Sequence, residues 1–438
     1  MSTTPVSQQP PETTVPQGRI QTFRALRYRN FRLLWISLIV SSIGTWLQIV
    51  SQSLLVLKIT HNSPVALGVV SLAQATSFFL FAFIGGSIAD QSDKRRFLLV
   101  TQSLSLLLAF ILGLLTITGI IQVWMIVLLA FCSGTVLSFD QPARSSLVPT
   151  LVPHSDLMNA LSLQSMVFNG AAFVGPTLAG VFIEVFTNID SHISTLKNSL
   201  FPYAGNFFLN AISFLGVLVV LYLLRLPKEA AELSTAKRGP LLASISASLR
   251  TVRRDAALPW ILSGYGALLF FGPSNTLILP IFAAQILHLS PAQLGLLFSA
   301  AGLGTILGAL IVASLGDFQH KGILLLSSLL IWTSSLLTFA LSHAFLLSLL
   351  ALLLFGIAQN GVGATTITLL QTRVPPQMRG RVMSLNTLLI MGVRPLGDFP
   401  ASGLIALVGG PLTVLLCASV VGLYSLYLLI ARPVIRSL

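Results

Sequence analysis

Long apolar stretches separated by short polar intervals dominate the chain from residue 33 onward. Helices that cross a lipid bilayer need about 20 mainly apolar residues, and these stretches reach or exceed that length. The pattern therefore predicts an all-α membrane protein with twelve transmembrane helices, several of them tilted. The predicted spans are 33–57, 65–89, 97–119, 122–139, 160–186, 204–224, 258–286, 292–316, 322–341, 344–370, 382–408 and 410–431.

The longest polar interval between spans, residues 225–257, divides the spans into two groups of six. In its second part Leu241, Ile245 and Leu249 fall on one helical face, which predicts an amphipathic helix lying on the membrane surface. The predicted organisation is a disordered cytoplasmic tail at 1–22, an N-terminal six-helix bundle at 23–226, a cytoplasmic linker with an amphipathic helix at 227–257 and a C-terminal six-helix bundle at 258–438.

Composition supports the membrane assignment and narrows the possible activities. The chain is 54% hydrophobic and only 8% charged, where soluble domains carry about 25% charged residues. The net charge of +13 comes from Lys and Arg next to span ends in alternate loops, which indicates membrane topology with both termini cytoplasmic and gives no reason to expect nucleic-acid binding. We find no GxxxxGK[ST] loop and no HExxH motif, so the sequence predicts no enzyme, no cofactor and no metal site. An ion gradient is then the expected energy source.

The segment GGSIADQSDKRR at 85–96 concentrates charge between the second and third spans. Gly86 would allow another helix to approach closely, and Asp90 could face the positive N-terminus of a neighbouring helix. The segment resembles the loop motif of the major facilitator superfamily, which implies a cytoplasmic gate; the alternative is an ordinary loop of positive charge on the cytoplasmic side. The matching residues are Gly86, Asp90, Lys94 and Arg95, whereas Gln91 and Asp93 replace a base and a glycine of the family pattern.

The second half of the chain repeats features of the first. Asp317 and Lys321 form a reduced copy of the loop motif, and Val152-Pro153 matches Val374-Pro375 after a shift along the chain. In this superfamily two such halves are related by an axis along the membrane normal, so the resemblance implies two pseudo-symmetric bundles.

The predicted fifth span contains a Gly-Pro pair that would bend a membrane helix. It resembles the antiporter motif that is commonest in exporters of the superfamily, which implies proton-driven export; the alternative is a kink that packs against the eighth span. The motif residues are Gly170, Gly175, Pro176 and Gly180.

Three longer stretches, 31–68, 140–176 and 371–385, are similar to the bacterial branch that contains the enterobactin exporter and related secretion-effector permeases. The resemblance implies a protein of the bacterial inner membrane. It does not select a substrate, because the branch also contains macrolide and multidrug exporters.

Polar side chains within the spans are candidates for a substrate cavity or for hydrogen bonds between helices. By the geometry of the resembled family, the first, fourth, seventh and tenth spans line the cavity. The resulting cavity candidates are Gln48, Gln52, Asn275, Gln359 and Asn360.

Arg394 and Asp398 place two charges near the middle of the eleventh predicted span. Each costs roughly 2.5–3.5 kcal/mol there without a partner or water, and their spacing lets them pair on one helical face. They could form a static ion pair, or Asp398 could take up a proton, free Arg394 and couple protonation to transport. Glu184, at the outer end of the fifth span, is the second candidate for a proton carrier.

These observations predict a proton-coupled secondary exporter of a small organic molecule, a siderophore or a hydrophobic drug, working by alternating access. The expected partners are the small-molecule substrate, protons and the lipid bilayer. A lipid or lysophospholipid translocator of the same fold and a membrane scaffold or sensor without transport are the alternatives.

Overall fold

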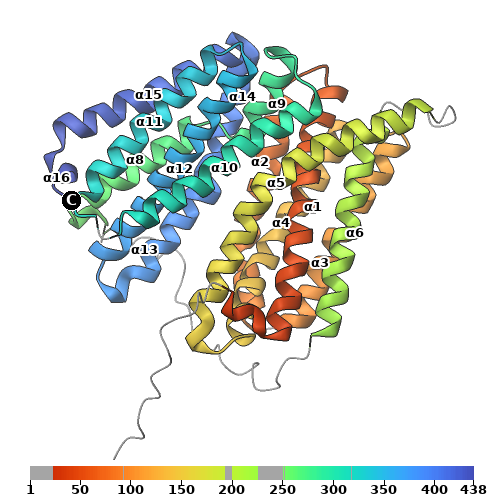
Figure 1. Cartoon of the computed structure of the whole chain (residues 1–438), viewed down its shortest axis with the longest axis horizontal. Helices are drawn as coiled ribbons and strands as arrows, with labels where there is room; N and C mark the ends of the chain where they lie inside the picture. Colours follow the sequence, from red (N-terminus) through yellow and green to blue (C-terminus); the bar gives the residue numbers. More distant parts are fainter. Residues whose placement is uncertain (1–22, 92, 193–199, 225–249, 251, 317) are drawn as a thin grey trace, which may run out of the picture.

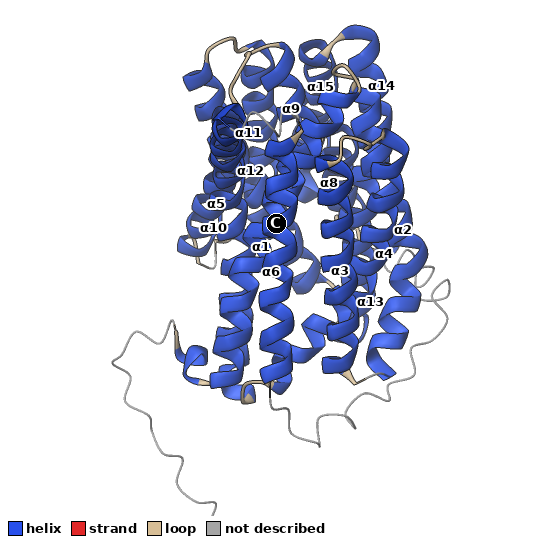
Figure 2. Ribbon diagram, turned by 90° about the vertical axis from the view of Figure 1, so that its right-hand side faces the viewer, coloured by secondary structure: helices blue, strands red, loops and turns tan. Residues whose placement is uncertain are grey.

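The computed structural model of the chain describes residues 23–91, 93–192, 200–224, 250, 252–316 and 318–438, although some side chains within these ranges are not described. The regular structure of the described residues is helical, as Figure 2 shows. The predicted tail at 1–22 and most of the linker, with its amphipathic helix, lie outside the described residues.

The N-terminal half of the described chain forms one helical bundle (Figure 1). Its elements are η1 (Arg24–Arg27), α1 (Arg29–Ile59), α2 (Pro64–Gln91), α3 (Lys94–Ile117), α4 (Val123–Leu147), η2 (Val148–Thr150), η3 (His154–Asp156), α5 (Leu157–His192) and α6 (Phe201–Leu223).

The C-terminal half forms the second bundle. Its elements are α8 (Leu258–Phe271), α9 (Asn275–Gln285), α10 (Pro291–Ser314), α11 (Lys321–Leu341), α12 (Phe345–Arg373), α13 (Pro376–Leu388), the π-helical segment η5 (Leu389–Val393), α14 (Arg394–Val408), α15 (Gly410–Ala431) and α16 (Pro433–Arg436).

Eleven helical segments of the described chain are long and apolar enough to cross a membrane, with α8 and α9 counted as one. Large apolar side chains on their outer surfaces, such as Leu80, Trp124, Ile212 and Leu407, are exposed. A lipid environment accounts for this exposure, which would be unusual for a soluble monomer. The expectation of an all-α membrane protein is therefore confirmed.

Two predicted spans depart from a regular α-helix in the structure. The stretch predicted as one helix at 258–286 breaks at Gly272–Ser274, because Pro273 has no N–H to donate and disfavours a helical conformation at the residue before it. The stretch predicted at 382–408 consists of α13, η5 and α14. These elements follow one another without a non-helical residue, so the predicted span is one continuous helix. Its α-helical pattern is interrupted by the π-helical η5, just before Pro395 in the first turn of α14.

The two bundles meet at one end and diverge at the other, as Figure 1 shows. The contacts run along α5 and α10 and along α2 and α14. We call the end with these contacts the closed side; it includes Gly68, Gly180 and Ser402. We call the opposite end the open side; it includes η1, the start of α3 and the start of α13.

A cluster of charged and polar side chains at the open side connects η1 to the segment between α4 and α5. The carboxylate of Asp156 is almost fully buried; it accepts a hydrogen bond from the Tyr28 hydroxyl at 2.7 Å and forms ion pairs with Arg24 at 3.0 Å and Arg27 at 2.8 Å. The hydrogen bond from Tyr28, together with the charges of Arg24 and Arg27, lowers the pKa of Asp156 below its ordinary value.

Replacement of Asp156 by alanine is expected to lower the free energy of unfolding by about 1–3 kcal/mol, because it leaves buried hydrogen-bonding groups without a partner. Since the folded-state pKa is depressed, the stabilising contribution is fully present above the unfolded pKa of about 3.9 and is lost as the pH falls through the folded value. Thermal unfolding in detergent from pH 7 to pH 3 tests this. An Asp156→Ala difference that stays constant over that range would contradict the assignment.

Candidate substrate and coupling site

The predicted cytoplasmic gate lies at the open side of the N-terminal bundle. Gly86 and Asp90 fall within α2, but the structure does not describe the side-chain surroundings of either residue. Asp317 itself lies outside the described residues. The Lys94 ammonium donates to the carbonyl of Ser146 at 3.2 Å, and Arg95 Nε donates to the carbonyl of Leu221 at 2.7 Å. Both bases therefore bind the C-terminal ends of helices in their own bundle, where the helix dipole favours cations. Lys321, their counterpart in the second half, begins α11.

Asp93, which departs from the family pattern, has a local structural role. Its carboxylate accepts hydrogen bonds from the backbone N–H groups of Arg95 and Arg96 at 2.9 and 3.1 Å, so it caps the N-terminus of α3. Such a cap stabilises a helix by roughly 1 kcal/mol.

The antiporter-like motif of α5 forms much of the contact between the two bundles. A Cβ added to Gly180 would overlap the Pro291 carbonyl of α10, and a Cβ added to Gly295 of α10 would overlap the Pro176 carbonyl. Gly175 instead faces α1, where an added Cβ would be 2.5 Å from Trp46 Cβ. Gly170 has no neighbouring atom within 4 Å. The motif thus packs against the eighth predicted span, as the structural alternative expected.

Hydrogen bonds reinforce this contact between α5 and α10. The hydroxyls of Thr177 and Ser299 are 2.6 Å apart, and the Ser299 hydroxyl also donates to the Phe173 carbonyl. Farther along α5, Glu184 Oε1 accepts a hydrogen bond from the backbone N–H of Ala292 at 3.2 Å. Glu184 therefore binds the N-terminal turn of α10 across the two bundles.

The five cavity candidates have different surroundings. Gln48 Oε1 accepts a hydrogen bond from Asn210 of α6 at 2.7 Å, so Gln48 joins helices within one bundle. Asn360 lies against α10, because a Cβ on Gly308 would be 3.0 Å from Asn360 Cβ. Gln52 and Asn275 are half-buried. The carbonyl oxygens of Gln359 and Asn360 are buried without a hydrogen-bond partner in the described structure.

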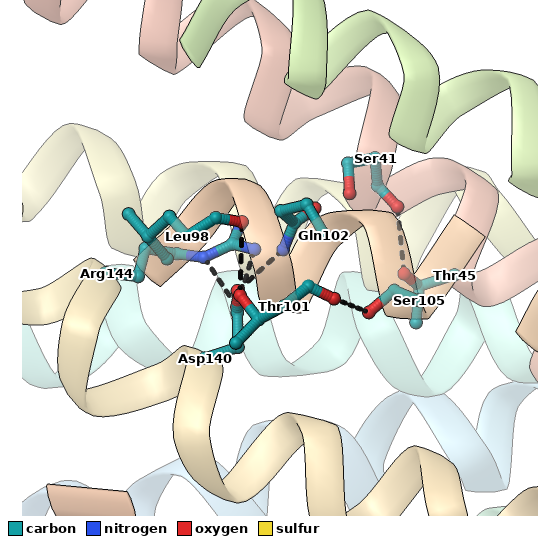
Figure 3. A network of polar contacts seen from close by, with 8 residues as sticks. All are labelled: Ser41, Thr45, Leu98, Thr101, Gln102, Ser105, Asp140 and Arg144. Carbon is teal, nitrogen blue, oxygen red and sulfur yellow. Dashed lines mark hydrogen bonds and ion pairs between the residues drawn. The ribbon is translucent and has the colours of Figure 1, made fainter. Parts of the chain in front are cut away.

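An ion pair in the N-terminal bundle was not among the predicted sites (Figure 3). Asp140 and Arg144 lie four residues apart on α4, with the closest nitrogen and oxygen 2.7 Å apart. The other carboxylate oxygen of Asp140 accepts hydrogen bonds from Thr101 at 2.8 Å and Gln102 at 2.7 Å, both on α3. The Asp-before-Arg spacing of four, the favourable order for a helix, is the sequence signal that could have identified it.

Asp398 lies where three elements meet at the closed side. Its Oδ1 accepts a hydrogen bond from the backbone N–H of Ser274 at 2.8 Å, just before α9. Its backbone carbonyl would be 3.6 Å from a Cβ on Gly68 of α2, and Ser71 of α2 interacts electrostatically with its carboxylate. The carboxyl is 2% exposed. One turn farther along α14, Ser402 lies against Gly68 of α2. Asp398 thus connects the broken helix of its own bundle to the opposite bundle.

Arg394 does not form the expected ion pair with Asp398, although both side chains belong to the described structure and interact electrostatically. The Asp398 carboxyl accepts the backbone N–H of Ser274 instead, because the break before α9 leaves backbone N–H groups in need of an acceptor. Arg394 Nε is buried without a hydrogen-bond partner in the described structure.

Comparisons with known proteins agree with this architecture. A sequence profile described as transmembrane secretion effector matches residues 20–436. The staphyloferrin A transporter of Staphylococcus aureus is 24% identical, covering 81% of this chain and 84% of its own length. The enterobactin exporter EntS of Citrobacter koseri is 26% identical, covering 90% and 88% respectively.

Among solved structures, a bacterial homologue of the human lysosomal transporter Spinster, in an inward-facing and unoccupied conformation, superposes with a TM-score of 0.69. It covers 93% of this chain and 96% of its own length at 14% sequence identity, so the likeness concerns the fold.

Proposed function

Because the chain belongs to the transmembrane secretion effector family of major facilitator transporters, we propose that it exports a small organic molecule by proton-coupled alternating access. The names of its relatives support a siderophore or a hydrophobic drug as the cargo class, because both siderophore transporters and macrolide or multidrug exporters are among them. The family assignment makes the chain a multi-pass membrane transporter of the major facilitator type and not an enzyme.

We place the open side at the cytoplasm of the cell inner membrane, with both chain termini on that side. Arg24, Lys94, Arg95 and Arg379 support this orientation, because all four lie toward the open side and Lys and Arg accumulate on the cytoplasmic side of membrane proteins. The conformation described above is then inward-open. The gating role of Asp90 stays a prediction.

The buried carboxyl of Asp398 at the junction of α2, α9 and α14 is the observation that carries the proposal. Asp398 and Ser402 of α14 lie against Gly68 of α2, and this contact between the two bundles must break when they separate at the closed side. Opening that side would expose the carboxyl to water, and closing it would bury the carboxyl again.

This change of surroundings supplies a route to proton coupling. Burial costs an ionised carboxylate far more than a neutral acid, so a proton bound from outside favours closure of the outer side. Proton uptake also removes the negative charge near Arg394. The proton then leaves toward the cytoplasm while the outer side stays closed, and the positive charge of Arg394 favours this release because it stabilises the carboxylate. With uptake from outside and release inside, the free energy of an inward proton gradient drives the return to the inward-open conformation after substrate release.

Transport by the purified full-length protein in liposomes tests the proposal. A panel of siderophores, hydrophobic drugs and labelled lysophospholipids is offered with and without an imposed pH gradient. Export of a small organic molecule that is accelerated by the gradient is the expected result. A transport rate that does not depend on the pH gradient would exclude proton coupling. Transport of lysophospholipids alone would favour the lipid translocator. Absence of transport of every compound in the panel would favour a scaffold.

A further inference from the structure

Two pairs of opposite charges, one in each bundle, have the same spacing but different geometry. Asp140 and Arg144 form a closed ion pair at 2.7 Å, and Thr101 and Gln102 complete the coordination of the carboxylate. In α14 the corresponding carboxylate, Asp398, accepts a hydrogen bond from the Ser274 N–H instead. The second pair therefore leaves its guanidinium without the counter-ion that the first pair provides.

The helices around Arg394 supply no alternative counter-ion. The helices that pack most against α14 are α2, α8 and α15. Helices α8 and α15 contain no acidic or basic residue. The acidic residue of α2, Asp90, lies about three turns farther along α2 than Phe79, which packs against Gly392. A guanidinium stays charged under all physiological conditions. An unpaired charge at this depth of a membrane protein is costly, and such residues are usually functional.

Neutral polar groups from two other helices lie near this guanidinium. Tyr265 of α8 interacts electrostatically with Arg394, and its hydroxyl would be 3.8 Å from a Cβ on Gly363 of α12. Gln359 precedes Gly363 by four residues, so the two occupy the same face of α12. The carbonyl oxygen of Gln359 is buried without a hydrogen-bond partner in the described structure, so it does not serve to hydrogen-bond neighbouring helices together.

We infer that Arg394 is the anion-binding residue of the transport site and that the substrate carries a carboxylate. This inference rests on the proposed transport function and adds the chemical class of the cargo. The guanidinium binds a carboxylate through two parallel N–H···O bonds and supplies the charge that balances it. The Tyr265 hydroxyl and the Gln359 amide are the neutral groups that complete the binding of the anion.

This arrangement separates the tasks of the two charged residues in α14. Asp398 is hydrogen-bonded to Ser274 at the contact between the bundles, whereas Arg394 remains available to a ligand. Export of a monoanion in exchange for a proton moves two positive charges inward per cycle. A membrane potential that is negative inside would therefore accelerate export in addition to the pH gradient.

Equilibrium binding to the full-length protein in nanodiscs tests the inference with two probes of matched shape, tritiated 1-naphthoate and 1-naphthamide. Wild type is expected to bind the carboxylate about tenfold more tightly than the amide, which corresponds to one charge-assisted interaction. Arg394→Gln is expected to abolish this preference, Arg394→Lys to retain part of it, and the exposed control Arg253→Gln to retain all of it.

Several results would overturn the inference. They are equal binding of the two probes by wild type, no binding of 1-naphthoate, and an unchanged preference in Arg394→Gln. If Arg394→Gln does not fold, the comparison between wild type and Arg394→Lys decides. A protein that exports an uncharged or cationic compound in liposomes but does not prefer 1-naphthoate would contradict the anion site and leave the proposed transport function intact.

Discussion

Replacement of Asp398 by asparagine is expected to reduce gradient-driven export about tenfold or more while leaving the fold intact. Asparagine can still accept the hydrogen bond from the Ser274 N–H, so the junction with α9 is preserved. It cannot take up or release a proton, and it stays neutral when the outer side closes. The loss of a charge-dependent interaction of about 1.5–3 kcal/mol corresponds to this change in rate.

The measurement is export from proteoliposomes at a series of imposed pH gradients. The expected signature is a rate that no longer depends on the gradient, because a merely structural role for Asp398 would lower the rate without changing that dependence. Asp93→Asn is the matched control, since Asp93 is an exposed N-cap where asparagine serves as well. If Asp398→Asn keeps the gradient dependence of wild type, Asp398 is not the coupling residue. If it fails to fold and Arg394→Leu with Asp398→Leu restores folding, the two charges serve the structure alone.

Replacement of Gly295 by alanine is expected to disfavour the conformation described here and to slow transport by roughly tenfold. The added methyl group would overlap the Pro176 carbonyl, which belongs to the backbone of α5 and cannot rotate away. Relief requires that α5 and α10 move apart at the closed side. Overpacking of this kind costs about 1–3 kcal/mol, which shifts an equilibrium between two conformations by about ten- to a hundredfold.

Distances between spin labels on the closed side of the two bundles, measured together with transport, test this expectation. Gly295→Ala should increase the fraction of molecules with separated bundles. Gly216→Ala in α6 is the control, because an added Cβ there meets no atom within 4 Å. A distance distribution in Gly295→Ala equal to that of wild type would show that the α5–α10 contact does not limit the conformational change.

The apolar pattern was sufficient to predict where most helices lie, because a bilayer sets the length and composition of any helix that crosses it. It failed at Pro273, where apolar residues continue across a break, and it did not predict the π-helical segment before Arg394. Hydropathy does not register whether a backbone N–H is available. The proline residues did carry that signal, but their effect depends on which side chains or neighbouring helices satisfy the freed groups.

For the candidate site, the sequence identified two charged residues that are costly to bury in a membrane. It did not identify the groups with which they form hydrogen bonds. Arg394 and Asp398 were found from their depth in a predicted span, and their spacing of four suggested an ion pair. A residue distant in sequence decided otherwise, since the Ser274 N–H reaches Asp398 only when the helices of the C-terminal bundle pack together. The same spacing at Asp140 and Arg144 does produce an ion pair, so spacing alone does not determine the outcome.

The sequence by itself determined that this protein is an all-helical membrane protein of the major facilitator type, because span length, charge distribution and the loop motif are local properties of the chain. The tertiary structure alone decided which glycines of α5 contact α10, that Gln48 bonds Asn210 within its bundle, and that Asp398 joins three elements while Arg394 remains unpaired. These features depend on contacts between helices far apart in the chain, and a contact of that kind has no fixed spacing from which it could be predicted.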